Sequence, residues 1–315
     1  MAGLSAAIYL GRARRDTLLL DAGKSMAQGE PDVQNYLGFP DGISGSDLLA
    51  RARQQARRYG IRCKREHVIR GWTRKGSFSL RGETGRYVCK RLLLATGILH
   101  IPPNIAGANT CLGHSMFFCK DCDGFRVQGK PIGVYGWRNE AVDYALGMLC
   151  YSSCVVILTD GHAPQWDKRR AGWIREYQIP VYLQPVIGTR RTRRRIRALR
   201  LNDRSLIEVA ALFTTRGDIY FNKLAAQLGA RINQNGEIAV DLNMRTTVPG
   251  LYAAGCVTPA NCQMIIAAGQ GAVSAQAINR DLFEESLKTH SLRRLRVRQL
   301  RYEKTRPRRK KAKTA

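Results

Sequence analysis

Two cysteines separated by two residues, Cys119 and Cys122, are the part of the chain best suited to chemistry. They lie in the segment Cys-Lys-Asp-Cys-Asp-Gly at 119–124. Two thiols at this spacing can close a small disulfide ring and reopen it, which makes the pair a two-electron reservoir. Asp123 directly follows the second cysteine, where a carboxyl group can manage the proton that accompanies the electrons. The segment therefore predicts a redox-active pair with an acid beside it.

Two other interpretations of these cysteines are open. A Cys-x-x-Cys pair can form half of a zinc site, with Cys150 and Cys154 as the second half. This would require a helical segment and the start of a strand to converge on residues 119–122. The two thiols could also be incidental. Because a lone pair at this spacing is more often catalytic than structural in a reducing compartment, the redox interpretation is favoured and no metal is expected.

A strand-turn-helix pattern follows the cysteines, which favours a nucleotide site beside the redox pair. An apolar strand at 131–135 leads into a turn that matches a dinucleotide fingerprint at Gly136 and Ala141, with Arg138 in place of the second glycine. The next strand ends at Asp160, where an acid favours the free ribose hydroxyls of NADH. Basic residues at 168–170 could instead hold the 2′-phosphate of NADPH. An ordinary βαβ unit without a ligand is the alternative.

The start of the sequence contains a second, incomplete pattern of the same kind. We expect a helix over 3–15 and a buried parallel strand over 17–21 that ends at Asp21. An acid at this place would bind the ribose of a dinucleotide. The strand and the first two glycines that usually precede such a helix are missing from this sequence. Gly3 can therefore only be the third glycine, which lets the helix pack close to the sheet.

The remaining segments alternate between strands and helices, which predicts an α/β fold. A turn-rich region at 29–45 precedes a helix at 46–59 that Ser46 caps, and three or four strands are expected over 61–95. Further strands are expected at 181–187, 197–202 and 206–213. A small-residue helix at 265–279 contains Gly269 and Gly271, which would allow a flat ligand or another backbone to approach closely.

Composition sets the outer limits of the prediction. The chain has 315 residues, of which 44% are apolar, enough for two domains. The sequence has no apolar run of about 20 residues, the length that spans a bilayer, and its first ten residues are unlike a signal peptide. Its nine cysteines without an extracellular framework indicate a cytoplasmic protein. Apart from Cys119 and Cys122, we expect the cysteines to be small buried hydrophobic residues.

The formal net charge of +28 is concentrated in two places. Residues 287–315 hold 13 Lys or Arg against the single acid Glu303, and seven arginines lie within 190–200. The tail has the composition of a disordered arm that could bind polyanions weakly by counterion release. Leu292, Leu295, Val297 and Leu300 have roughly helical spacing, so the first half of the tail could instead be a basic amphipathic helix. A solvated tail without a partner is the simpler interpretation.

Over residues 1–286 the chain resembles the low-molecular-weight thioredoxin reductase family, truncated at its N-terminus and with degenerate cofactor motifs. The redox motif at 119–124 is the most specific feature of this resemblance. The other features are 3–7 with Asp21, Asn35-Tyr36, Ala95-Thr96-Gly97, the turn at 136–141, and 250–271. The resemblance implies two Rossmann-like, three-layer dinucleotide-binding domains. The FAD domain would be discontinuous, at 1–115 and 245–286, and a nicotinamide domain at 116–244 would be inserted in it.

The resemblance also implies roles for individual residues. Cys122 would face the flavin, Cys119 would attack the substrate disulfide, and Asp123 would be the acid-base partner. FAD would be held by Gly3, Asp21, Asn35, Thr96, Gly97, Gly255, Cys256 and Gln263, and NADP or NAD by Gly136, Asn139, Ala141 and Asp160. Cys256 stands where the family has an aspartate that contacts the ribityl chain of the flavin.

The implied function is electron transfer from NAD(P)H through FAD to the Cys119–Cys122 disulfide, and from there to thioredoxin or a similar dithiol protein. Members of the family are usually homodimers. Two alternatives remain open. One is an oxidoreductase with another acceptor, such as a quinone or ferredoxin. The other is a degenerate, non-catalytic homologue in which the basic tail binds polyanions.

Overall fold

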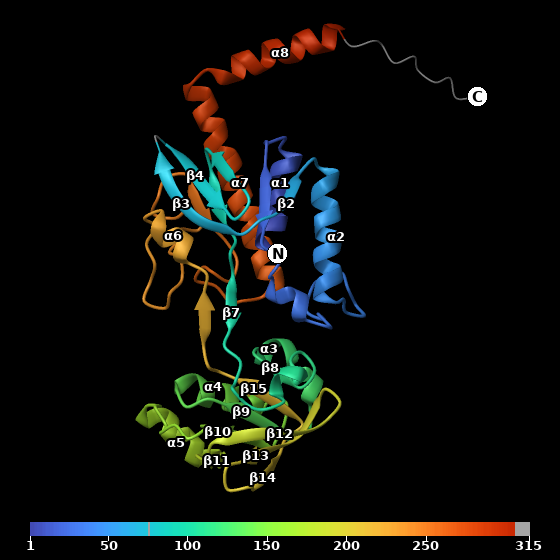
Figure 1. The fold of residues 1–315 in the computed structure, drawn as a ribbon, viewed down its shortest axis with the longest axis vertical. Coiled ribbons are helices and arrows are strands. Elements are labelled where there is room, and N and C mark those ends of the chain that lie inside the picture. Colours follow the sequence, from blue (N-terminus) through green and yellow to red (C-terminus); the bar gives the residue numbers. More distant parts are fainter. Residues whose placement is uncertain (75, 306–315) are drawn as a thin grey trace, which may run out of the picture.

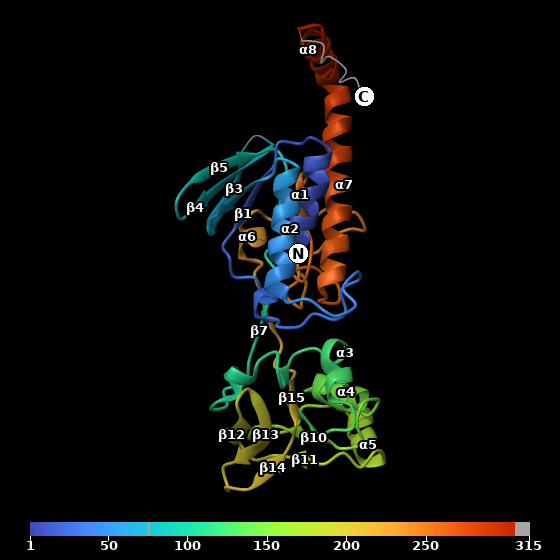
Figure 2. The ribbon, with the colours of Figure 1, turned by 90° about the vertical axis from the view of Figure 1, so that its right-hand side faces the viewer.

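The computed structural model describes residues 1–74 and 76–305, which form two α/β units stacked along the long axis of the molecule (Figures 1 and 2). The fold class predicted from the sequence is confirmed. The helices of the first unit are α1 (Ala2–Arg12), α2 (Gly45–Arg58), α6 (Lys223–Gln227) and α7 (Met264–Lys288), with a 3-10 turn, η1, at Met26–Gly29. Its strands are β1 (Leu18–Asp21), β2 (Arg62–Arg65), β3 (Val68–Arg74), β4 (Ser77–Gly82), β5 (Arg86–Cys89), β6 (Leu92–Leu94) and β17 (Leu251–Ala253).

The parallel strands of the first unit form two separate pairs, β1 with β2 and β6 with β17. Helix α1 packs against both pairs, because Leu4 and Ala7 contact Leu19 on one side and Leu10 lies with Tyr252 on the other. Helix α7 covers α1 at close range. A Cβ atom at Gly271 would lie only 2.2 Å from the carbonyl oxygen of Ala2. Small residues therefore bring the two helices together over the divided sheet.

A three-stranded antiparallel sheet, β3-β4-β5, completes the first unit. Its buried residue Phe78 packs in one cluster with Leu94 and Leu251, and with Leu228 and Ile238 from the segment around α6. Residues 225–238 thus belong to the core of the first unit. They were expected in the inserted domain, which by this packing ends near residue 217 rather than at 244.

The second unit is built around one continuous sheet in the order β11-β10-β9-β15-β8, in which all neighbouring strands are parallel. Its strands are β8 (Met116–Phe117), β9 (Ile132–Tyr135), β10 (Val155–Leu158), β11 (Val181–Tyr182), β12 (Val186–Thr192), β13 (Arg195–Leu201), β14 (Leu206–Glu208) and β15 (Ala211–Thr214). Its helices and 3-10 turns are η2 (Ala108–Cys111), α3 (Lys120–Asp123), η3 (Gly124–Val127), α4 (Asn139–Met148) and α5 (Lys168–Glu176). Strands β12–β14 form an antiparallel appendage, but the strands expected at 181–187 and 206–213 are each divided between it and the parallel sheet, as β11 with β12 and as β14 with β15.

The core of the second unit also begins earlier than expected. Ile105, Ala108 and Cys111 pack with Met116 and Tyr135, so they lie in the second unit although the sequence boundary was placed at 115. Two antiparallel strands, β7 (Ile98–His100) and β16 (Asp218–Tyr220), join the units. His100 Nδ1 lies 2.5 Å from Asp218 Oδ1 across this pair. The connection is therefore a two-stranded ribbon.

Several expected element boundaries shift for local reasons. Helix α2 is capped by Ser44 rather than Ser46, because the Ser44 hydroxyl accepts a hydrogen bond from the Asp47 N–H at 3.0 Å. Helix α1 ends at Arg12, since Arg14 has a positive φ of 58°. The strand expected at 17–21 is not buried, because β1 pairs on one edge only among the described residues. Five strands, rather than three or four, occupy the region from 61 to 95.

Helix α7 continues to Lys288, well beyond the expected end at 279, and α8 (Ser291–Thr305) follows it and extends away from both units (Figure 1). The helical interpretation of the first half of the tail is thus confirmed, and disorder there was the wrong prediction. Leu295 and Val297 are about half exposed. Residues 306–315, where the polyanion-binding arm was expected, lie outside the described residues. Over 1–74 and 76–305, no helix is sufficiently long and apolar to cross a membrane.

Candidate redox site

Cys119 and Cys122 form a disulfide at the end of the second unit that faces the first unit. The single turn of α3 holds them, and Cys119 caps that turn because its Sγ accepts a hydrogen bond from the Cys122 N–H at 3.1 Å. A backbone donor at this place stabilises negative charge on the Cys119 sulfur once the disulfide opens. Among the described residues there is no cluster of ligands that could hold a metal. A second pair of zinc ligands beside Cys119 and Cys122 is therefore not found in that part of the chain.

Asp123 is buried, with 9% of its surface exposed, and Arg126 donates a hydrogen bond to its Oδ1 at 2.9 Å. Burial raises the pKa of Asp123 above its ordinary value, and the Arg126 guanidinium opposes that shift only in part. A carboxyl group with a raised pKa holds a proton more readily. Asp123 is therefore placed, one residue from Cys122, where it can store a proton beside the disulfide.

Gln263, immediately before α7, joins the disulfide to the first unit. Its Nε2 lies 3.3 Å from Sγ of Cys119 and 3.2 Å from Sγ of Cys122. Its Oε1 accepts a hydrogen bond from Nδ2 of Asn35 at 2.9 Å. The structure thus brings together four of the residues expected in the site, from three segments that are far apart in the sequence.

A second group of expected residues meets at the N-terminus of α1. The carboxyl ends of β6 and β17 lie side by side, with Leu94 paired to Ala253, and lead into Gly97 and Gly255, which have positive φ values of 71° and 86°. A Cβ at Gly255 would lie 3.2 Å from that of Ala2, and one at Gly3 would lie 3.4 Å from that of Ala95. These residues form a side-chain-poor edge of the kind that receives ligands in α/β sheets.

Thr96 and Asp21 stand at the same edge, but both already have partners. The Thr96 hydroxyl donates a hydrogen bond to the carbonyl of Phe221 at 2.7 Å. Asp21 accepts one from the Gly23 N–H at 2.8 Å and pairs with Arg53 at 3.0 Å. Burial acts to raise the pKa of Asp21, yet the hydrogen bonds from Gly23 and Arg53 outweigh it and lower the pKa. Asp21 is therefore ionised near neutral pH and about one third exposed.

The nucleotide turn of the second unit has the predicted strand-turn-helix form, with Gly136 after β9 and Asn139 opening α4. Ala141 is fully buried, and a Cβ at Gly136 would lie 3.2 Å from its methyl group. Asn139 Oδ1 accepts a hydrogen bond from the Asp167 N–H at 3.0 Å. The side chain of Arg138 is exposed. A side chain at this position has to be exposed if the turn is to remain accessible to a ligand.

Asp160 differs from the expectation. It follows β10, but one carboxylate oxygen accepts a hydrogen bond from the Tyr135 hydroxyl and the other accepts one from the Val186 N–H at 2.8 Å. Burial and this carboxylate raise the pKa of Tyr135. Because both oxygens of Asp160 serve the protein, its expected preference for a free ribose hydroxyl has no support in this geometry. Arg170 pairs with Asp143 and Asp167, so it too is engaged.

The cysteines also differ from the expectation. Cys256, expected against the flavin as a thiol, is joined in a disulfide to Cys262. Cys150 and Cys154 are exposed, Cys63 and Cys89 are half-buried, and Cys111 is buried. Only Cys111 fits the expectation of a small, fully buried hydrophobic residue. The pairing of Cys262 was missed, and the six-residue spacing of two cysteines around a loop was the one available signal.

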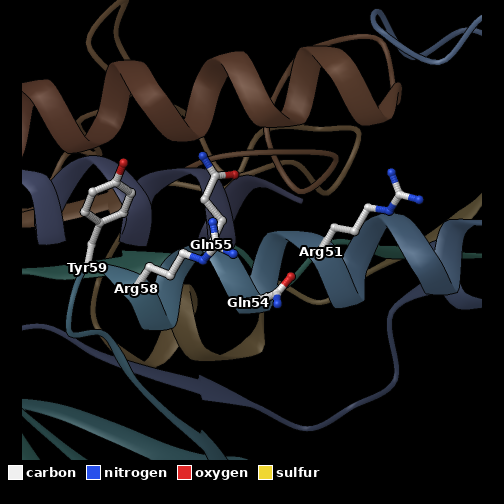
Figure 3. Close-up of a pocket in the computed structure, with 5 residues that line it drawn as sticks. All are labelled: Arg51, Gln54, Gln55, Arg58 and Tyr59. Carbon is white, nitrogen blue, oxygen red and sulfur yellow. The ribbon is translucent and has the colours of Figure 1, made fainter.

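Two hollows lie away from the redox site. One of about 470 Å³ runs along α2 in the first unit and is lined by Arg51, Gln54, Gln55, Arg58 and Tyr59 (Figure 3). Another of about 310 Å³ lies on the arginine-rich strands β12–β14. Neither is lined by a residue of the redox site. The redox residues are therefore found at the disulfide and the strand ends and not in either hollow.

The fold and this site define a class: a two-unit α/β oxidoreductase in which a Cys-x-x-Cys disulfide lies against the ligand edge of a second dinucleotide-binding unit. The model of the pyridine nucleotide-disulphide oxidoreductase family matches residues 1–275. The chain belongs to this family, and within it to the low-molecular-weight thioredoxin reductase group. FAD and NADPH are the cofactors of that group.

Individual relatives agree with this assignment. The chain is 26% identical over 302 residues to the thioredoxin reductase of Listeria innocua, covering 91% of this chain and 92% of that protein. It is 28% identical over 285 residues to that of Treponema pallidum, covering 88% and 92%. Among solved structures, HlmI superposes with a TM-score of 0.86 at 28% identity, with 94% of each chain covered. A putative thioredoxin reductase of Bacillus anthracis gives 0.82 at 25%, covering 90% and 96%.

The N-termini of α1 and α4 are suited to bind the pyrophosphate groups of the two dinucleotides. Helices α1 and α4 each begin without a side-chain cap, so their first N–H groups are available to an anion. In front of α1, a Cβ at Gly97 would meet no atom within 4 Å, which leaves room for a ligand. Asp21, at the end of β1, is partly exposed, whereas both carboxylate oxygens of Asp160, in the corresponding place of the second unit, accept hydrogen bonds from the protein.

Proposed function

We propose that this oxidoreductase passes electrons from NAD(P)H to the Cys119–Cys122 disulfide and on to thioredoxin or a similar dithiol protein. The observation that carries the proposal is the contact of both sulfurs with Gln263, next to the strand ends of the first unit. When bound there, FAD would accept a hydride and supply two electrons to the disulfide. The similarity to the thioredoxin reductases of Listeria innocua and Treponema pallidum supports thioredoxin as the type of substrate.

The steps after reduction fall to residues of this chain. The Cys119 thiolate, stabilised by the Cys122 N–H at 3.1 Å, attacks one sulfur of the substrate disulfide, so that a mixed disulfide forms and the other substrate sulfur leaves as a thiolate. Cys122 then attacks the Cys119 sulfur, which restores the disulfide and releases a substrate thiolate. Asp123, whose pKa is raised by burial, gives that thiolate a proton and is recharged as the pair is reduced again.

We propose the division of labour between the units on the same grounds. The first unit would bind FAD through Gly3, Asp21, Asn35, Thr96, Gly97, Gly255, Cys256 and Gln263. The second would bind NADP or NAD through Gly136, Asn139 and Ala141. A homodimer, a cytoplasmic location and weak polyanion binding by the tail remain predictions from the sequence and the family resemblance.

Serine variants of the two cysteines test the proposal. Cys119→Ser should lower the rate of thioredoxin disulfide reduction by about 10³-fold or more, because the attacking sulfur is gone. Reduction of the bound flavin by NAD(P)H should still occur, because that step precedes the disulfide. The matched control is Cys154→Ser, because Cys154 is an exposed cysteine outside the site. This variant should reduce thioredoxin at the wild-type rate. Sustained turnover by Cys119→Ser with a quinone or ferredoxin as the physiological acceptor would favour the alternative function instead.

A further inference from the structure

The loop between β17 and α7 contains a second disulfide, Cys256–Cys262. It closes a short loop within the first unit, at the same edge that carries Gly255 and Gln263. Neither cysteine is fully buried. A disulfide that is partly accessible and close to a thiol pair can exchange with it.

The two ends of this loop are held differently. At the Cys256 end, Gln270 Oε1 accepts hydrogen bonds from the Gly255 N–H at 2.7 Å and from the Thr258 hydroxyl at 3.3 Å, and Thr258 is fully buried. At the Cys262 end, residues 259–263 form no helix or strand, and Pro259 and Asn261 are exposed. Cys262 is therefore on the arm that can move, and Cys256 on the arm that is anchored.

The movable end adjoins the first disulfide. Cys262 precedes Gln263, whose Nε2 contacts both Cys119 and Cys122 at 3.3 and 3.2 Å. One peptide unit, about 3.8 Å between Cα atoms, separates Cys262 from the residue that touches both sulfurs. Exchange requires a rotation of this irregular segment that brings Cys262 Sγ to Cys119 Sγ.

We propose that Cys256–Cys262 is a second redox centre that exchanges electrons with Cys119–Cys122. The Cys119 thiolate attacks Sγ of Cys262, so that a Cys119–Cys262 bond forms, the Cys256–Cys262 bond breaks, and Cys256 leaves as a thiolate. The Cys122 thiolate then attacks Sγ of Cys119 and displaces Cys262. The first pair is thereby oxidised and the second reduced, with two electrons and two protons transferred in all.

The second centre would store two further electrons on the flavin side of the molecule and offer them to a substrate disulfide. It relies on the proposed function only for the source of electrons at the first pair. The exchange itself is a thiol–disulfide reaction within one chain. It can therefore be tested without NAD(P)H or a substrate protein.

A trapping variant tests the exchange. Cys122→Ser leaves Cys119 as a free thiol that cannot return to its own partner, so only the released Cys256 thiolate can reverse its bond to Cys262, and alkylation of Cys256 captures that bond. The purified full-length variant is incubated without reductant, alkylated, digested without reduction, and its linked peptides are identified by mass. The matched control is Cys122→Ser combined with Cys262→Ser, which retains Cys119 and the free Cys256 but has no disulfide to attack.

The proposal predicts a peptide linked between Cys119 and Cys262 in chains of monomer mass, with alkylated Cys256 and loss of the Cys256–Cys262 linked peptide. The control should show Cys119 alkylated. An intact Cys256–Cys262 linkage with Cys119 alkylated in the trapping variant would overturn the proposal. That result does not bear on whether NAD(P)H reduces the first pair, so the proposed function stands or fails separately.

Discussion

The two units organise their parallel strands differently. In the second unit, β9 lies between β10 and β15, and all four of its residues are buried. In the first unit, β1 pairs only with β2 among the described residues, and none of its four residues is buried. The second unit is thus held by a continuous sheet, whereas the first depends on α1 and α7 to connect two separate strand pairs.

The difference shows where each unit is vulnerable. A central strand such as β9 has hydrogen-bonded neighbours on both edges, and its side chains pack into the cores on both faces of the sheet. The connection in the first unit is made by backbone contact between α1 and α7 at Ala2 and Gly271. Because close packing tolerates little added volume, a single methyl group at that contact should affect the first unit more than one at a comparable place in the second.

The largest effect is expected from Gly271→Ala. The new methyl group would meet the carbonyl oxygen of Ala2 at 2.2 Å, and a backbone atom cannot move aside without separating the helices. We expect a loss of about 3 kcal/mol in unfolding free energy, measured by urea denaturation. The control is Gly269→Ala on the same helix, where no atom lies within 4 Å. That change should stabilise the protein by about 1 kcal/mol through helix propensity, and equal losses in both variants would contradict the packing argument.

An intermediate effect is expected from the buried carboxylate of Glu66 in the first unit. Hydrogen bonds from Thr84 and Tyr87 lower its pKa from 4.5 to about 2. A lowered pKa means that the ionised form stabilises the fold at pH values above about 4.5, and that this stabilisation is lost as the pH falls toward about 2. Glu66→Gln should therefore lower the melting temperature at neutral pH and flatten its decline over that range.

The control for Glu66 is Glu83→Gln, since Glu83 is exposed and, within 1–74 and 76–305, has an ion pair only with His67. Its melting temperature should follow the wild-type curve at every pH. Thermal unfolding monitored by circular dichroism between pH 2 and pH 7 measures both variants. A wild-type curve that does not decline in acid would contradict the assignment.

The smallest effect is expected from Gly136→Ala in the second unit. Its methyl group would approach Thr215 Oγ1 at 2.1 Å, but this atom is the end of a side chain. We expect a loss of about 1 kcal/mol. Adding Thr215→Ala should recover most of it, and a double-mutant cycle measures the coupling. If the losses in unfolding free energy of the two substitutions were additive, the backbone rather than Thr215 would limit the space beside Gly136. The second unit would then resemble the first, in which a backbone atom limits the space beside Gly271.

Local patterns predicted the site well where the chemistry depends on neighbours in sequence. The spacing of Cys119 and Cys122 fixes their pairing within one helical turn, and Gly136 with Ala141 fixes the strand-turn-helix. The fold class followed from the alternation of strands and helices. The approach of Gln263 to the disulfide depends instead on how the two units are stacked. Gln263 was expected, from the family resemblance, to bind FAD, and its contact with the disulfide was not predicted.

Other features could not be predicted because they depend on distant partners. Asp160 has the right place after its strand, yet Tyr135 and Val186, each about 25 residues away in sequence, take both of its oxygens. The disulfide of Cys256 depends on the path of a loop that brings Cys262 back to it. The boundary near residue 217 depends on α6 packing under the three-stranded sheet of the first unit.

The most direct test of the account follows the electrons from the nicotinamide to the first pair of sulfurs. The FAD-loaded protein is mixed with a limiting amount of NADPH without oxygen, alkylated, and mapped by mass while the visible flavin absorption is recorded. The account predicts bleaching of the flavin followed by alkyl groups on Cys119 and Cys122 in wild-type protein. Bleaching that leaves Cys119 and Cys122 joined, with no alkyl group on any cysteine that was part of a disulfide, would contradict it.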